Sequence, residues 1–350
     1  MRFVHDTLPQ RVRFASGEAA TELAEEIEDL GTGRLMVIAA EPERPLANRV
    51  ADGLPVAVWH HEVAMHVPRK VVRAACQVAR SHTVDALVSV GGGSTTGLAK
   101  AVALETGLPI VALPTTYAGS EATQVWGMTE DSRKQTGTDP RVLPRTVIYD
   151  AALTLSLPVG MSMASGLNAL AHCIDAMWAP RADPINAALA AEGIRTLSAG
   201  LPLVKADPAG LAGREQALYG AYLAAVSFAS AGSGLHHKIC HVLGGMFDLP
   251  HAQTHAVVLP HVLAANGPYA PKAERRIATA FGSATADQGL RSLRQHLDAP
   301  VALRDYGMPE DGIAPAAQSV LAQAPPANPA PLDIHHLTSL IRAAWEGDLP

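Results

Sequence analysis

The chain has 350 residues, of which 48% are hydrophobic and 17% are charged, so it can bury a large core, and its length is typical of two domains. Its formal net charge of −6 gives no basic field that would attract nucleic acid, and its three widely spaced cysteines give no disulfide framework. The N-terminus lacks an apolar signal segment and no run approaches the ~20 apolar residues of a membrane span, so we expect a soluble cytoplasmic protein that binds no membrane.

The first 150 residues alternate between short β-rich runs and helical patterns, which is typical of a parallel α/β sheet. The runs that predict buried strands are 34–40, 55–60, 85–90, 109–114 and 146–150. The helical patterns between them are 17–31, 69–82 and 95–107. Two stretches near the start, RFVHD and RVRFASG, are compatible with an antiparallel hairpin at the edge of the sheet.

The composition changes after Asp150, where Ala-rich helical patterns replace the strands. We therefore expect residues 1–155 to form an α/β domain and residues 156–350 to form an all-α domain. The helices predicted in the second domain are 161–178, 184–199, 213–232, 234–246, 271–282, 285–297 and 334–346.

A glycine-rich turn, GGGSTTGLAK, follows the predicted strand at 85–90. The glycines Gly91, Gly92 and Gly93 remove side chains where backbone can approach a ligand, and Ser94 is placed to cap the next helix, ahead of Thr95. Free N–H groups at such a helix start bind anions, including the pyrophosphate of a dinucleotide. The motif is not the GxGxxG fingerprint, and a turn that only links strand to helix is the alternative.

A second polar loop, LPTTYAGSEAT at 113–123, also follows a predicted strand, at the edge of a parallel sheet where ligands bind. Its candidate cofactor-binding hydroxyls belong to Thr115, Thr116 and Ser120. A polar surface turn is the alternative, but two such loops after neighbouring strands favour a nucleotide site. Ala39 and Ala40 precede Glu41 where an acid would select NADH, so we expect NADH or NADPH as the cofactor.

Two pairs of side chains in the predicted helices are four residues apart, so each pair lies on one helix face. The pairs are Asn168 with His172 and His237 with His241, and His251 follows just after Pro250. This spacing can gather imidazoles around one small volume, and we predict the chemical site there. A single histidine is more often a structural residue, but four in these positions favour a site.

The order of these motifs resembles the iron-containing alcohol dehydrogenase superfamily over nearly the whole chain. The motifs are GGGS followed by AK, PTTYAGSE, YDAALTLSLP, SGLNALAH, HHKICHVLGG and LPHA. The resemblance implies a dehydroquinate synthase-like fold, with an N-terminal NAD(P)H-binding domain, a C-terminal helical catalytic domain and catalysis in the cleft between them. Metal-dependent members hold a divalent metal with an Asp and three His, at positions that are Asn168, His172, His237 and His251 here.

Two departures resemble one branch of that superfamily, the maleylacetate reductases. Asn168 replaces the ligating Asp, and its neutral amide is a poorer partner for a hard dication, while Gly97 replaces an Asp usual in the metal alcohol dehydrogenases. The resemblance implies reduction of the conjugated C=C of maleylacetate to 3-oxoadipate by NADH or NADPH, in degradation of aromatic compounds. It further implies a homodimer and no bound metal.

In that reaction, hydride would add to the carbon β to the ketone and leave an enolate, which preorganised hydrogen-bond donors stabilise. The histidines expected in the active site are His172, His237, His241 and His251. His241 is the preferred proton donor, because its counterpart approaches the nicotinamide in the wider family. Asn168 is expected to orient His172 or to bind substrate.

The two carboxylates of the substrate need nearby cations or dipoles. Tyr117 and Lys238 are expected to contact this small dicarboxylate. A further group of cations precedes the domain boundary, namely Arg133, Lys134, Arg141 and Arg145. For each of these cations, a solvated surface charge is the alternative.

Three other functions remain open at this stage. The first is a metal-dependent alcohol or aldehyde dehydrogenase in which Asn168 is a weak ligand. The second is a lyase-type enzyme like dehydroquinate synthase, and the third is a non-catalytic binding protein. Metal content, sensitivity to a chelator and binding of NADH would separate these functions.

Overall fold

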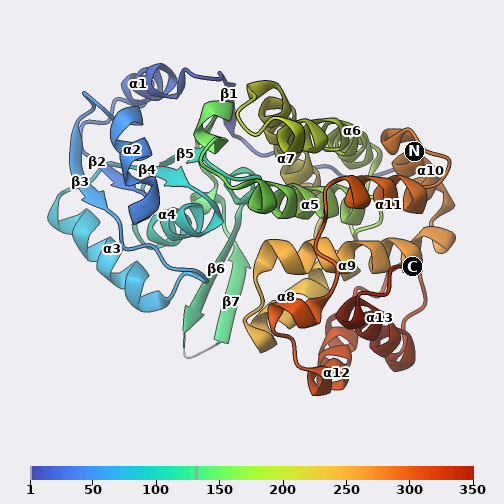
Figure 1. Ribbon diagram of the computed structural model, residues 1–350. Helices are drawn as coiled ribbons and strands as arrows, with labels where there is room; N and C mark the ends of the chain where they lie inside the picture. The colour runs from blue at the N-terminus through green and yellow to red at the C-terminus, as the bar shows by residue number, and fades with distance from the viewer. Residues whose placement is uncertain (1, 131–132) are drawn as a thin grey trace. The chain divides into compact units, whose positions relative to one another are not determined.

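The computed structural model describes residues 2–130 and 133–350, apart from the side chains of Arg133 and Lys134. The chain forms two compact units (Figure 1): Leu8–Leu157, and Pro158–Pro350 together with the segment up to Thr7. The predicted division at 155/156 lies two residues before this one. The prediction also placed the N-terminal segment in the wrong unit, because Nδ1 of His5 lies 2.9 Å from Oδ2 of Asp183 in the helical unit.

The unit Leu8–Leu157 is built on a six-stranded sheet whose paired neighbours are all parallel. In spatial order its strands are β1 (Arg11–Phe14), β8 (Thr146–Tyr149), β5 (Ile110–Pro114), β4 (Ala86–Gly91), β2 (Leu35–Ile38) and β3 (Val56–His60). Five of these six are the predicted strands, so the predicted α/β class is confirmed. Continuous apolar runs such as LMVI in β2 form them because both faces of a parallel sheet are covered.

Four helices accompany this sheet: α1 (Ala19–Leu30), α2 (Arg44–Val50), α3 (Arg69–Ser81) and α4 (Gly93–Thr106). α1 and α2 share an apolar core with the sheet that includes Leu23, Val37 and Val88. α3 packs on α4, and α4 contacts β4 and β5 (Figure 1). α4 begins at Gly93, directly after β4 ends at Gly91, so the glycine-rich turn joins the strand to the helix.

The predicted antiparallel N-terminal hairpin is wrong. Only Arg11–Phe14 forms a strand there, and it pairs in parallel with β8, because the apolar side chains of β8 continue the sheet on that side. The one antiparallel ribbon among the described residues was not predicted: it joins β6 (Val125–Glu130) to β7 (Arg133–Thr138).

The second unit contains helices and no strand among its described residues, as predicted. Its α-helices are α5 (Val159–Ala176), α6 (Pro184–Ala206), α7 (Leu211–Ala231), α8 (Leu235–Phe247), α9 (His251–Asn266), α10 (Pro271–Phe281), α11 (Ala286–His296), α12 (Ile313–Gln323) and α13 (Ile334–Glu346). Two of them, α9 and α12, were not predicted, and both contain a proline that the sequence pattern treats as a breaker.

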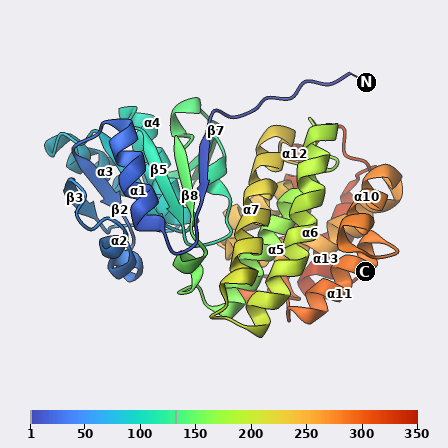
Figure 2. The same cartoon turned by 90° about the horizontal axis from the view of Figure 1, so that it is seen from above.

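α5, α6 and α7 lie side by side (Figure 2). Glycines allow the close approach of α6 to α7, since a Cβ at Gly200 would lie 2.8 Å from the backbone oxygen of Gly213. α8, α9, α12 and α13 share a second apolar core around Ile239, Val258 and Ile341. No helix in the described part of the chain is long and apolar enough to cross a membrane.

Candidate functional site

In the α/β unit, the two loops predicted to bind a nucleotide begin side by side. β4 and β5 are neighbours, with Gly91 opposite Pro114. The backbone N–H of Thr115 donates to the carbonyl oxygen of Gly91 at 3.2 Å. The sheet therefore brings both loops to one edge, which is where parallel sheets bind ligands.

The three glycines of the first loop meet different constraints. Gly91 has φ +156°, and a Cβ there would lie 2.5 Å from Oγ1 of Thr95. A Cβ at Gly92 would lie 2.9 Å from Cγ2 of Thr116 in the second loop. Gly93 is exposed, and a Cβ there would meet only Ala118, at an ordinary 3.5 Å. Packing thus requires the first two glycines, while the third keeps a surface open.

Ser94 is not the helix cap that the sequence predicted. α4 begins at Gly93 with Gly92 as its N-cap, and no side chain caps it. Ser94 is the second residue of the helix, because the chain turns into the helix two residues earlier than the GGGS pattern suggests. The N–H groups of the first turn have no partner within the helix, which suits an anion.

A buried lysine that the sequence analysis missed supports the second loop. Lys100 is 0% exposed, and its Nζ donates to the carbonyl oxygens of Ser120 (2.5 Å) and Val125 (2.8 Å) and to Oγ1 of Thr123 (3.0 Å). Burial lowers the pKa of Lys100 to about 7, although the nearby carboxyl of Glu121 opposes this shift. The AK that follows GGGS was the signal that could have identified it.

The other predicted residues of these loops differ in exposure. Thr95 and Thr115 are buried, and Thr116 and Ser120 are partly exposed. Tyr117 was predicted to contact the substrate, but its side chain is fully buried. That contact stays a prediction.

In the helical unit, α5 and α8 bring His172 and His237 together. Both side chains are buried, and their ring centroids lie 5.0 Å apart in a stacked arrangement. Phe228 of α7 packs on both rings, at 5.0 Å from His172 and 4.2 Å from His237. The structure thus brings together two of the predicted histidines, and their role in a site stays a prediction.

His241 and His251 lie at the exposed side of this cluster. The ring of His241 is 6.0 Å from that of His237, and both His241 and His251 are exposed. His251 contacts the cluster through His255, at a centroid distance of 4.3 Å. An exposed imidazole beside buried ones is placed to exchange protons with a ligand.

Three members of the cluster were missed as site residues: Asp175, His236 and His255. Oδ2 of Asp175 accepts from Nδ1 of His237 at 2.7 Å and from the backbone N–H of Gly234 at 2.8 Å. Asp175 lies three residues after His172, and His255 four after His251, so helical spacing could have identified both. Nε2 of His236 lies 3.0 Å from Nδ1 of His255.

Burial controls the charge of this cluster. It lowers the pKa of His172 and of His236 to about 3, and the pKa values of His237 and His255 fall well below the ordinary value. Burial also raises the pKa of Asp175 to about 7. The buried imidazoles are therefore neutral near pH 7, and each can donate one hydrogen bond and accept another.

Asn168 does not orient His172 through its amide oxygen. Among the described residues, Oδ1 of Asn168 and Nδ1 of His172 are both buried without a hydrogen-bond partner. Nε2 of His237 is in the same state. Buried polar atoms that are left without a partner are costly, so these three are candidates for contact with a ligand.

The predicted cations differ in their surroundings. Lys238 is partly buried on α8, beside His237. The guanidinium of Arg141 donates to the carboxylate of Asp139 at 2.7 Å and to the carbonyl oxygen of Leu104 at 2.9 Å. These contacts hold its side chain within the α/β unit. The side chains of Arg133 and Lys134 lie outside the described residues.

Comparison with known proteins identifies the family. The family described as iron-containing alcohol dehydrogenase matches residues 9–151, and the C-terminal part of the Fe-containing alcohol dehydrogenase family matches residues 162–345. Maleylacetate reductase of Pseudomonas sp. (strain P51) is 46% identical, covering 100% of this chain and 99% of that protein.

Solved structures agree with these matches. An iron-containing alcohol dehydrogenase from Corynebacterium glutamicum is 60% identical with a TM-score of 0.98, covering 99% of this chain and 98% of that one. Maleylacetate reductase from Agrobacterium tumefaciens is 42% identical with a TM-score of 0.95, covering 100% of both chains. The chain therefore belongs to the iron-containing alcohol dehydrogenase family, is an oxidoreductase, and groups with the maleylacetate reductases within that family.

Proposed function

We propose that this protein reduces the conjugated C=C of maleylacetate to 3-oxoadipate, with hydride from NADH or NADPH. The observation that carries this proposal is its identity of 40–46% to curated maleylacetate reductases over 99–100% of the chain. The histidine cluster supports the proposal, because it offers hydrogen-bond and proton donors, while Asn168 gives no carboxylate at the family's position for a metal ligand.

The α/β unit is the proposed cofactor domain. Its uncapped α4 start suits the pyrophosphate of NADH or NADPH, which would approach over Gly93. Thr116 and Ser120, which are partly exposed, are the hydroxyls of the second loop assigned to the same cofactor. The alternative for this loop is a polar surface turn without a ligand, and it is less favoured because the buried Lys100 holds the loop in place.

The helical unit is the proposed catalytic domain. Once hydride has added to the alkene carbon, negative charge develops on the ketone oxygen. An N–H group of His172 or His251 would donate to that oxygen, and His241 would deliver a proton to carbon. His237, whose Nδ1 proton is held by Asp175, would offer Nε2 as a hydrogen-bond acceptor. Lys238 would bind a substrate carboxylate, and the amide of Asn168 would hydrogen-bond to the substrate.

The family position for iron does not fit this chain. Its four residues would supply an amide and three imidazoles and so lack the anionic carboxylate that accompanies histidines at non-haem Fe(II) sites. In addition, His172, His237 and His251 do not form a group whose ligand atoms lie within 4.8 Å of one another in the described residues. We therefore derive no step through a metal at this position.

The alternative is a metal-dependent alcohol or aldehyde dehydrogenase, favoured by the 60% identity to the Corynebacterium glutamicum protein. The decisive measurement is oxidation of NADH and of NADPH with maleylacetate, on protein treated exhaustively with chelator and checked for residual iron and zinc. We expect rapid turnover. No turnover, together with activity on an alcohol or aldehyde that iron or zinc restores, would establish the alternative. The homodimer and the cytoplasmic location stay predictions.

A further inference from the structure

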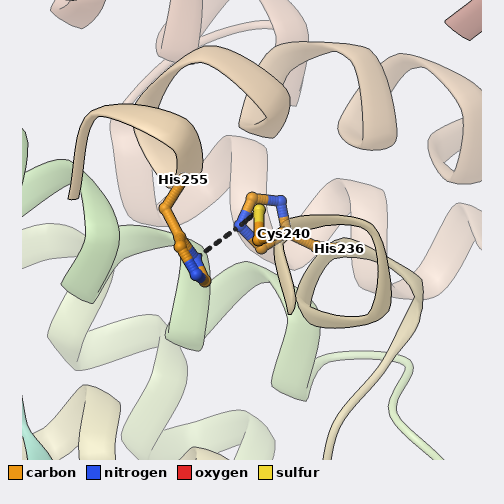
Figure 3. Close-up of side chains that lie close together, drawn as sticks. All are labelled: His236, Cys240 and His255. Carbon is orange, nitrogen blue, oxygen red and sulfur yellow. Dashed lines mark hydrogen bonds between the residues drawn. The ribbon is translucent and has the colours of Figure 1, made fainter. Parts of the chain in front are cut away.

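A second group of ligand atoms lies beside the family position. His236 and Cys240 on α8 and His255 on α9 converge on one point (Figure 3). Nε2 of His236 lies 3.0 Å from Nδ1 of His255 and 3.6 Å from Sγ of Cys240, and all three ligand atoms lie within 4.8 Å of one another. Each residue is at most 2% exposed.

These distances resemble the edges of a tetrahedral metal site. With metal–nitrogen bonds of about 2.0 Å and metal–sulfur bonds of about 2.3 Å, two nitrogens lie about 3.3 Å apart and nitrogen and sulfur about 3.5 Å apart. The two pairs that involve His236 lie within about 0.3 Å of these edges, and the ligand atoms of Cys240 and His255 lie within 4.8 Å of each other. Within the described residues this is the one group of three His, Cys, Asp or Glu side chains that meets the distance criterion.

The protonation states also suit a metal. Burial keeps both imidazoles neutral, which is their ligand form. The two nitrogens now share one proton, and a tautomer change would move it to the outer nitrogen of the same ring, either Nδ1 of His236 or Nε2 of His255. Both of these atoms are buried without a partner among the described residues. Binding would then release a single proton to solvent, from the thiol of Cys240.

The charge of the ion would be balanced locally. A dication and the thiolate of Cys240 leave one positive charge in a buried place. Burial raises the pKa of Cys240, and the nearby carboxyl of Asp175 adds to this shift. Oδ1 of Asp175 is buried without a hydrogen-bond partner in the described part of the chain. Its carboxylate supplies the remaining negative charge, so the buried site is neutral overall.

We infer that His236, Cys240 and His255 form a binding site for a thiophilic divalent ion of the Zn²⁺ or Co²⁺ class. The ion would join α8 to α9, and it would be separate from the family position at Asn168, His172, His237 and His251. Thiolate and imidazole ligands select such ions over the hard cations that carboxylates bind. This inference does not rest on the proposed reduction of maleylacetate.

The test is titration of the chelator-treated, full-length protein with Co²⁺, followed by absorption. We expect one Co²⁺ per chain and an intense thiolate-to-metal band in the near ultraviolet, which an equivalent of Zn²⁺ removes. Cys240→Ser should lose the band. Cys173→Ser, a matched change at a buried thiol on α5, should keep it, and circular dichroism would check that both variants fold.

Two results would overturn the inference. The first is wild-type protein that binds no Co²⁺ or binds it without the thiolate band, which needs no variant to interpret. The second is a band that survives Cys240→Ser or disappears in His251→Gln, since the latter would place the ion at the family position. Because the readout is a spectrum and not turnover, failure here leaves the proposed function standing, and the reverse also holds.

Discussion

Asp175 is a buried carboxyl that holds Nδ1 of His237 at 2.7 Å and the backbone N–H of Gly234 at 2.8 Å. The first contact fixes which nitrogen of His237 carries its proton, because Asp175 accepts from Nδ1 and leaves Nε2 facing away from it. Nε2 has no partner among the described residues. Asp175 is thus a positioning residue that presents one defined nitrogen of His237 to a ligand.

We expect Asp175→Asn to lower kcat by roughly 10²-fold while the Kd for NADH changes little, because an amide can donate to His237 and stabilise the wrong tautomer. Steady-state kinetics and NADH titration measure the two quantities. Nitrogen NMR of the His237 ring would report the tautomer itself. Unchanged kcat with a changed tautomer would show that the tautomer of His237 does not matter to the reaction.

His241 is exposed beside His237 and is the proposed proton donor. Loss of a general acid typically costs 10²–10⁴-fold, so His241→Ala should lower turnover of maleylacetate by roughly that factor, with NADH affinity intact. His335→Ala is the control, since it removes an exposed imidazole from α13. Wild-type turnover in His241→Ala would remove the proton donor from the proposal.

The sequence could identify the histidines that sit in motifs, but not their partners. His172 and His237 were predicted from four-residue spacing, and the structure places their rings 5.0 Å apart. Helical spacing from His172 places Asp175 on the same face of α5, but its bond to His237, about 60 residues later, is a contact that local spacing does not encode. His255 lies inside a helix that the proline at position 260 concealed.

At the scale of elements, the glycine-rich turn contains one glycine that packing requires and another that is proposed to leave room for the cofactor. Gly93→Leu should fold normally and weaken NADH binding, because the position is exposed and open while its side chain would cover the α4 start. Gly91→Ala should instead destabilise the protein, since its φ of +156° and the nearby Oγ1 of Thr95 leave no room for a Cβ. Thermal melts and NADH titration of both variants distinguish the effects. Equal NADH affinity in Gly93→Leu and wild type would contradict a cofactor site at this turn.

Lys100 ties α4 to the second loop and should make stability depend on pH. Its pKa falls from 10.5 in the unfolded chain to about 7 in the folded one, so the unfolded chain binds more protons between these values. Stability therefore rises with pH across this window, by at most about 1.4 kcal/mol per pH unit. Burial raises the pKa of Glu121 above its ordinary value of 4.5. Above pH 4.5 this carboxyl therefore makes the stability fall with rising pH, which opposes the effect of Lys100.

We expect Lys100→Met to flatten the rise of Tm between pH 7 and pH 9.5 and to lower Tm at pH 9.5, because three oxygen acceptors lose their donor. Lys70→Met, at an exposed position on α3, is the matched control and should follow wild type. A Lys100→Met curve parallel to wild type would mean that the ammonium is not lost in this window.

The sequence predicted which segments form strands and helices, but it predicted less well which strands pair with each other. Apolar runs and intervening helical patterns identified β2, β3, β4, β5 and β8, since parallel strands are buried on both faces. Arg11–Phe14 also reads as a strand, but its parallel pairing with β8 joins segments about 135 residues apart, which a local hairpin pattern cannot express. The β6–β7 ribbon was not predicted, because its strands are partly exposed and contain polar residues.

For the whole molecule, the change of composition after Asp150 predicted two units of different class, and each unit has its own apolar core. The proposed chemistry is divided in the same way. The nucleotide loops belong to Leu8–Leu157, and the histidine cluster belongs to Pro158–Pro350. A ligand that contains only the adenosine and pyrophosphate part of the cofactor should therefore affect the first unit alone.

Hydrogen exchange with ADP tests this division, because a bound ligand slows the local opening of the backbone that it contacts. We expect ADP to protect peptides that cover 91–107 and 113–123, while peptides from α5, α8 and α9 exchange as in the free protein. Gly93→Leu should lose this protection at the same ADP concentration. Protection of α5 and α8 by ADP, with none at 91–107, would place the nucleotide in the helical unit and would overturn the assignment of the glycine-rich turn.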